Sequence, residues 1–239
     1  MTTGSSDPYF FLSFATSNSR DDALVLRFFR DLGDEVRAAA GLRPDQGDTV
    51  GFLSMATLRL GADWWNDLRE ALDGSATFVA LCAPTYFTSP ACGKEWRSFT
   101  DRLAAHRAAR GGAAPCLLPV PWLRGPMPEV VAGLQYVDRS LSPTVHETGL
   151  RDLMLLHRYR DDYAAFTGAL ARHVVGLARR HSLPRGRTTE DYDRQPQAFP
   201  VPGGHIPTAR TATDQPPVAP APVDPPDLRD DRFPRLQSP

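Results

Sequence analysis

Residues 77–96 read TFVALCAPTYFTSPACGKEW. The run from Thr77 to Cys82 is almost entirely apolar, which is typical of a strand buried on both faces of a parallel sheet. Ser89 and Pro90 then carry the signals of a helix start, a serine cap with a proline in the first turn. A buried strand followed directly by a helix is the repeating unit of an α/β fold.

The same alternation continues on both sides of this stretch. Further buried strands are predicted at residues 9–14, 50–53, 116–118 and 134–137. Ser19 with Asp22 has the pattern of a capping box for a helix that ends at Gly41, and Asp63 is predicted to cap the next helix. We therefore predict a flavodoxin-like α/β domain with a five-stranded parallel sheet flanked by helices. Ligands of such sheets bind beyond the carboxyl ends of the strands.

The chain changes composition near Pro184. Twelve of the 55 residues from Arg185 to Pro239 are proline, and the only aromatic residues there are Tyr192, Phe199 and Phe233. Such a segment has too little apolar surface to offset the entropy of ordering it. We therefore predict a disordered N-terminus over residues 1–7, a domain over residues 8–184 and a disordered proline-rich tail over residues 185–239.

Composition and motifs exclude several classes of function. The net charge of −1 gives no sign of nucleic-acid binding, so no nucleic-acid partner is expected. No apolar run is long enough for a membrane span, so no membrane partner is expected. A cytoplasmic location is expected. The three cysteines and six histidines have no metal-ligand spacing, so no metal is expected. The loop after the first strand contains no glycine, which excludes a dinucleotide fingerprint and a P-loop, and no cofactor is expected.

Three stretches in order resemble the Toll/interleukin-1 receptor (TIR) domain family. They are Phe11 to Ala15 (F-x-S-F-A), the loop that ends in Gly61 to Trp64 (G-x-x-W), and residues 81–95, which end in Cys92 to Glu95 (C-x-x-E). The resemblance covers roughly residues 9–137 and implies the TIR fold. The sequence is similar in particular to actinobacterial TIR-like proteins encoded beside radical-SAM peptide-modifying enzymes.

The resemblance implies two kinds of function. The first is a signalling or scaffold module that binds other TIR domains, itself or proteins encoded nearby. Its contacts would come from the loop after the second strand, at Met55, Leu58, Arg59, Leu60 and Gly61. The second is hydrolysis of NAD at the nicotinamide–ribose bond without a metal, with NAD as substrate, Glu95 as the catalytic carboxylate and ligand contacts from Phe14, Ala15, Ser54 and Trp64.

Two positions depart from the enzyme pattern. Active families commonly place an aromatic residue four positions before the glutamate, where this chain has Ala91, and many members carry an acidic residue where this chain has Ser54. Glu95 also has a structural explanation, because a carboxylate near a helix N-terminus is stabilised by the helix dipole. The residues therefore leave both functions open, and the interaction module is the leading one.

Overall fold

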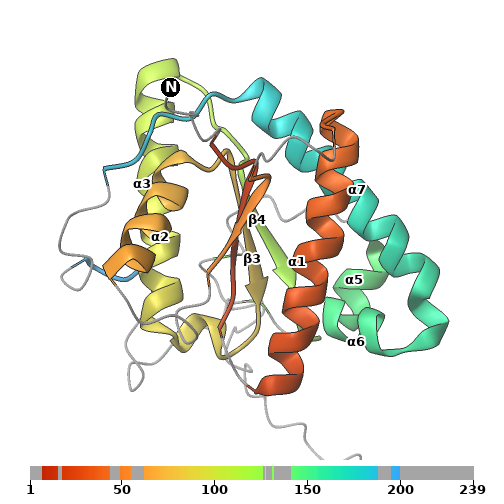
Figure 1. Cartoon of the computed structure of the whole chain (residues 1–239). Coiled ribbons are helices and arrows are strands. Elements are labelled where there is room, and N and C mark those ends of the chain that lie inside the picture. Colours follow the sequence, from red (N-terminus) through yellow and green to blue (C-terminus); the bar gives the residue numbers. More distant parts are fainter. Residues whose placement is uncertain are drawn as a thin grey trace, which may run out of the picture. The chain divides into compact units, whose positions relative to one another are not determined.

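A parallel sheet forms the centre of the domain, with its strands in the order β2-β1-β3-β4 (Figure 1). The computed structural model describes residues 7–15, 18–43, 49–54, 62–125, 127, 131, 141–187 and 195–199. Within these residues the sheet has four strands: β1 (Phe10–Ser13), β2 (Gly51–Leu53), β3 (Thr77–Cys82) and β4 (Leu117–Pro121). The predicted parallel α/β sheet is confirmed with four strands rather than five. The fifth strand, predicted at residues 134–137, lies outside the described residues.

Helices cover both faces of the sheet (Figure 1). On one face lie α1 (Ser19–Ala40) and α7 (Arg160–Arg180), and on the other lie α2 (Ala62–Gly74) and α3 (Pro90–Arg110). The short helix η1 (Tyr86–Thr88) links β3 to α3. Between β4 and α7 the chain forms α5 (Pro143–Thr148), α6 (Leu150–Leu155) and η2 (His157–Tyr159). None of the helices in the described residues combines the length and apolarity that a membrane span requires.

The helix ends follow the sequence signals with two exceptions. Ser89 caps α3 by accepting a hydrogen bond from the Cys92 amide, and Gly41 ends α1 with a φ of 74°, as predicted. The predicted Ser19–Asp22 capping box is wrong, because the cap of α1 is Asn18, whose side chain accepts from the amides of residues 20 and 21. The cap predicted at Asp63 is also wrong, because α2 already begins at Ala62.

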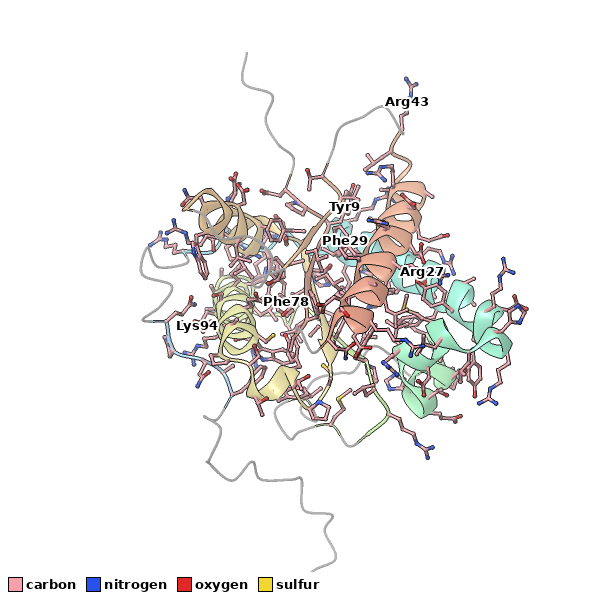
Figure 2. The ribbon with its side chains drawn as sticks, turned by 60° about the horizontal axis from the view of Figure 1, so that its bottom comes forward. Tyr9, Arg27, Phe29, Arg43, Phe78 and Lys94 are labelled. Carbon is pink, nitrogen blue, oxygen red and sulfur yellow. The ribbon has the colours of Figure 1, made fainter. Side chains whose placement is uncertain are left out.

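Stacked phenylalanine rings fill the space between the sheet and the second pair of helices. The Phe11 ring stacks on Phe52 at 5.5 Å and on Phe78 at 5.4 Å, and Phe78 contacts Phe99 of α3 at 5.2 Å. On the other face, Phe10 packs against Phe29 of α1, so that Phe29 and Phe78 lie on opposite sides of the sheet (Figure 2). Residues at odd positions of β1 therefore face α2 and α3, which decides where Ser13 points.

Two segments beyond residue 184 pack onto the domain. The Gly186 amide donates to the Asp73 carbonyl at 3.0 Å, and the Ala198 amide donates to the Gly93 carbonyl at 3.0 Å. Phe199 is only 4% exposed. The contacts of the domain thus extend past the boundary predicted at residue 184. Phe199 is buried because its ring packs against aromatic rings of η1 and α3. The rest of the predicted tail lies outside the described residues.

Candidate functional site

The carboxylate of Glu95 is enclosed by side chains from three other parts of the fold. Ser13, at the end of β1, donates a hydrogen bond to Glu95 Oε2 at 2.5 Å, and Ser54, directly after β2, donates one to Oε1. The Tyr86 hydroxyl of η1 lies 3.0 Å from Ser13 Oγ. Because the single hydroxyl hydrogen of Ser13 is directed at Glu95, Tyr86 is the donor in that pair. We call Ser13, Ser54, Tyr86 and Glu95 the carboxylate network.

The register of the sheet brings the two serines together. Phe11 pairs with Phe52 across β1 and β2, and side chains on one face of a strand recur every second residue. Ser13 and Ser54 therefore both point to the face that α3 covers, one step beyond the stacked rings. The cap at Ser89 fixes the start of α3, and helical spacing places Glu95 on the same buried side as Cys92 and Phe99. The carboxylate thus meets both hydroxyls at the carboxyl edge of the sheet.

Burial controls the acidity of Glu95. The residue is 1% exposed, and desolvation raises its pKa from 4.5 to about 7, although the hydrogen bonds from Ser13 and Ser54 act in the opposite direction by favouring the charged form. No charged side chain among the described residues contributes to this shift of the Glu95 pKa. Both the protonated and the ionised form are therefore populated near neutral pH.

The cysteines near this network are buried and free of disulfides. Desolvation raises the pKa of the Cys82 and Cys92 thiols well above the ordinary value, so neither is a thiolate at neutral pH. Among the described residues, no group of histidine, cysteine or acidic side chains could hold a metal ion.

A cavity of about 270 Å³ lies on the other side of β1, at the carboxyl ends of β1, β3 and β4. Between β1 and β3 the order of the strands reverses, which is the position where open α/β sheets commonly bind ligands. Phe14 and Ala15 line this cavity together with Pro84, Thr85 and Trp122. Asp21 borders it and forms an ion pair with Arg151 of α6 at 2.7 Å. The volume of the cavity lies just below the range of about 300–1,000 Å³ that is usual for small-molecule sites.

Comparison with known families fits this arrangement of strands and loops. The family model described as TIR domain matches residues 10–154, which is more than half of the chain. The chain belongs to the TIR domain family. No curated protein matches it.

The predicted site residues whose side chains the structure describes lie in two different places. Glu95 and Ser54 lie together in the carboxylate network, whereas Phe14 and Ala15 lie at the cavity on the opposite face of β1. The backbone of Trp64 belongs to α2, but its side chain lies outside the described residues. The predicted partner residues Met55, Leu58, Arg59, Leu60 and Gly61 also lie outside them. The ligand and partner roles of all these residues stay predictions.

Two members of the network, Ser13 and Tyr86, are not among the site residues predicted from the sequence. Ser13 could have been found, because it stands two residues after Phe11 and therefore on the same face of the strand as Phe11. Tyr86 gave no such signal, since the short helix η1 that aims its hydroxyl at Ser13 has no periodic pattern in the sequence. Trp96, next to Glu95, is buried against Phe78 and Tyr86 and does not fill the place of the aromatic residue that position 91 lacks.

Proposed function

We propose that this TIR domain is a signalling or scaffold module that works by binding other TIR domains. The observation that carries the proposal is that the carboxylate of Glu95 is enclosed by other side chains. Each of its carboxylate oxygens accepts a hydrogen bond from a serine, and the residue is 1% exposed. A carboxylate in this state ties β1, β2 and α3 together, and its burial keeps both oxygens away from a substrate in solution.

The cavity supports the same proposal. Glu95 is not among the residues that line it. A TIR domain that binds and cleaves NAD needs its carboxylate beside the bound ribose. The separation of the cavity from Glu95 by β1 therefore favours binding of a protein over hydrolysis of a dinucleotide.

The proposed partner is a second TIR domain, from another copy of this chain or from another protein, including proteins encoded nearby. The proposed contact residues are those that the family resemblance implied: Met55, Leu58, Arg59, Leu60 and Gly61. Leucine and methionine in a loop suit an interface that excludes water, and the single arginine suits its polar rim.

Sedimentation velocity of the full chain over a wide range of protein concentration tests this proposal. We expect reversible self-association that Leu58→Asp abolishes, because a carboxylate in an apolar contact loses its hydration without gaining a partner. Leu156→Asp is the matched control, since Leu156 is an exposed leucine between α6 and η2. A wild-type chain that stays monomeric at the highest concentration, or a Leu58→Asp chain that associates like the wild type, contradicts the proposal for self-association.

The second candidate function is metal-independent hydrolysis of NAD through Glu95. The observation that favours it is the raised pKa of this buried carboxyl at the carboxyl edge of the sheet, because perturbed acids gather at catalytic sites. An ionised carboxylate beside the ribose would stabilise the cation that forms as neutral nicotinamide leaves, before water adds to it. Catalysis would require the two serines to release the carboxylate towards the substrate.

A further inference from the structure

The segment Gln195–Phe199 lies against η1 and the first half of α3, although β4, α5, α6 and α7 lie between them in the sequence (Figure 1). Its largest contact is made by the side chain of Phe199. Phe199 is 4% exposed in a region of sequence that is poor in apolar residues. Burial of a lone phenylalanine in such a segment indicates a specific site on the domain and not a general collapse of the segment.

That site is an aromatic pocket, which we define by Tyr86, Phe87, Gly93 and Trp96. The centre of the Phe199 ring lies 5.2 Å from that of Phe87, 5.5 Å from that of Trp96 and 5.7 Å from that of Tyr86. The Phe87 and Phe199 rings meet edge to face at 70°, an arrangement that aromatic pairs prefer, and the planes of the other two pairs are tilted by 59°. The three rings of the aromatic pocket are thus placed so that an aromatic side chain packs against all of them.

Gly93 gives the segment room to approach α3. A Cβ atom at this position would lie 3.0 Å from Gln197 Cβ and 3.3 Å from Phe199 Cδ2, closer than such atoms normally come. Glycine inside a helix costs stability relative to alanine, and Gly93 has no positive φ that would require it. The missing side chain therefore serves the close approach of the segment to the helix.

One backbone and one side-chain hydrogen bond hold the segment against α3. The Ala198 amide donates to the Gly93 carbonyl at 3.0 Å, and Gln195 Nε2 donates to Ser98 Oγ at 2.6 Å. Gln195 Oε1 is buried without a hydrogen-bond partner among the described residues, so this end is held less well than the Phe199 end. The entropy lost in ordering a short segment offsets much of the gain from burying Phe199, so we expect a docked form that is the major one but still exchanges with a free form.

We propose that the aromatic pocket is a peptide-binding site for a segment that carries a phenylalanine, and that the chain fills it with its own residues Gln195–Phe199. The pocket consists of other residues than those proposed for contacts between TIR domains, which are in the range 55–61. It also touches the carboxylate network, because Tyr86 packs its ring on Phe199 and directs its hydroxyl at Ser13. A peptide that displaces the segment therefore contacts Tyr86, which belongs to the carboxylate network.

Binding of a peptide in trans tests the proposal. The probe is a fluorescein-labelled peptide of residues 193–201, DRQPQAFPV, titrated by fluorescence polarisation into full-length Phe199→Ala protein. We expect saturable binding, and binding about tenfold or more weaker to the wild type, whose own segment competes at high effective concentration. The peptide with alanine in place of phenylalanine is expected not to bind, and Phe233→Ala, the same substitution elsewhere in the tail, is expected to behave like the wild type.

Two further measurements keep the test decisive if Phe199→Ala impairs folding. In the wild type, the Ala198 amide is expected to exchange with solvent about tenfold or more slowly than in the free peptide. Gly93→Ala is expected to reduce that protection while α3 remains helical, because the added methyl group lies closer to Gln197 and Phe199 than such atoms normally come. Exchange of the wild-type Ala198 amide at the free-peptide rate, or equal peptide affinity of wild type and a folded Phe199→Ala protein, overturns the proposal.

Discussion

Ser13 on β1 and Glu95 on α3 are joined by a hydrogen bond of 2.5 Å, although 82 residues separate them in the chain. The contact connects the centre of the sheet to the helix that covers it. With Ser54 on the second carboxylate oxygen, the buried acid becomes the common acceptor of two neighbouring strands. The stability of this part of the fold therefore depends on the protonation state of one side chain.

The first prediction is that Glu95 makes unfolding depend on pH. Its pKa is about 7 in the folded protein against 4.5 without burial, so the folded state keeps a proton that the unfolded state releases. The free energy of unfolding should then fall as the pH rises between these values, by roughly 3 kcal/mol in total. Glu95→Gln removes the titrating group and should flatten this descent.

Urea unfolding at about pH 5 and about pH 8 measures the effect. The matched control is Glu70→Gln, the same substitution at an exposed position of α2, which should keep the descent of the wild type. If Glu95→Gln lost as much stability over this range as the wild type, another group would have to carry the pH dependence.

The second prediction concerns Ser13→Ala. This substitution removes the donor to Oε2 and leaves a buried oxygen without a partner, which should lower the free energy of unfolding by about 1–3 kcal/mol at neutral pH. The loss should be smaller in acid, where the protonated carboxyl needs fewer donors. Ser182→Ala, at an exposed position after α7, should change stability by less than about 0.5 kcal/mol. Equal losses for Ser13→Ala in acid and at neutral pH would separate the serine from the charge of Glu95.

The third prediction concerns Arg102 of α3, which is 4% exposed and contacts three backbone carbonyls. It donates to Leu72 at 2.7 Å, to Ser75 at 2.8 Å and to Pro184 at 3.0 Å. Arg102→Met should lower the free energy of unfolding by about 3 kcal/mol or more, because these carbonyls lose a shared donor. Arg97→Met is the control, since Arg97 pairs with Asp101 at the surface and should contribute less than about 1 kcal/mol. Thermal or urea unfolding compares the two variants.

Much of the fold follows from local sequence signals. The run from Thr77 to Cys82 coincides with β3, and the caps at Ser89 and Gly41 lie where the residue types predict them. Asn18 and Ser19 are neighbouring residues that can both cap a helix, so the choice between them depended on backbone angles that the sequence does not reveal. Local chemistry thus predicts the elements well and their first residues less well.

The candidate site could be predicted only in part, because its essential features come from tertiary contacts. The family pattern pointed to Glu95 and Ser54, and helical spacing from Cys92 places Glu95 on the buried side of α3. Closure of its carboxylate depends on two strands in register and on η1, which no single segment encodes. Phe199 was placed in a disordered tail for the same reason: its partners are rings of a distant helix, and the composition of its own segment says nothing about them.

The last prediction separates the two candidate functions by nicotinamide release from NAD. If the protein is an interaction module, we expect no release of nicotinamide by the purified full chain, because Glu95 is buried and both of its carboxylate oxygens accept hydrogen bonds from serines. If the chain does cleave NAD, the carboxylate form is required, and the rate should rise with pH through about 7 and then level off.

The variants make this test specific. Glu95→Ala and Glu95→Gln should then both abolish nicotinamide release, whereas Ala91→Trp should increase it if an aromatic ring near the ribose is the missing element. The rate should also rise faster than linearly with protein concentration if residues 55–61 of a second copy complete the site. Robust cleavage by the wild type contradicts the interaction module as the whole function, and cleavage that survives Glu95→Gln contradicts catalysis by this carboxylate, since an amide cannot carry the charge that stabilises the ribosyl cation.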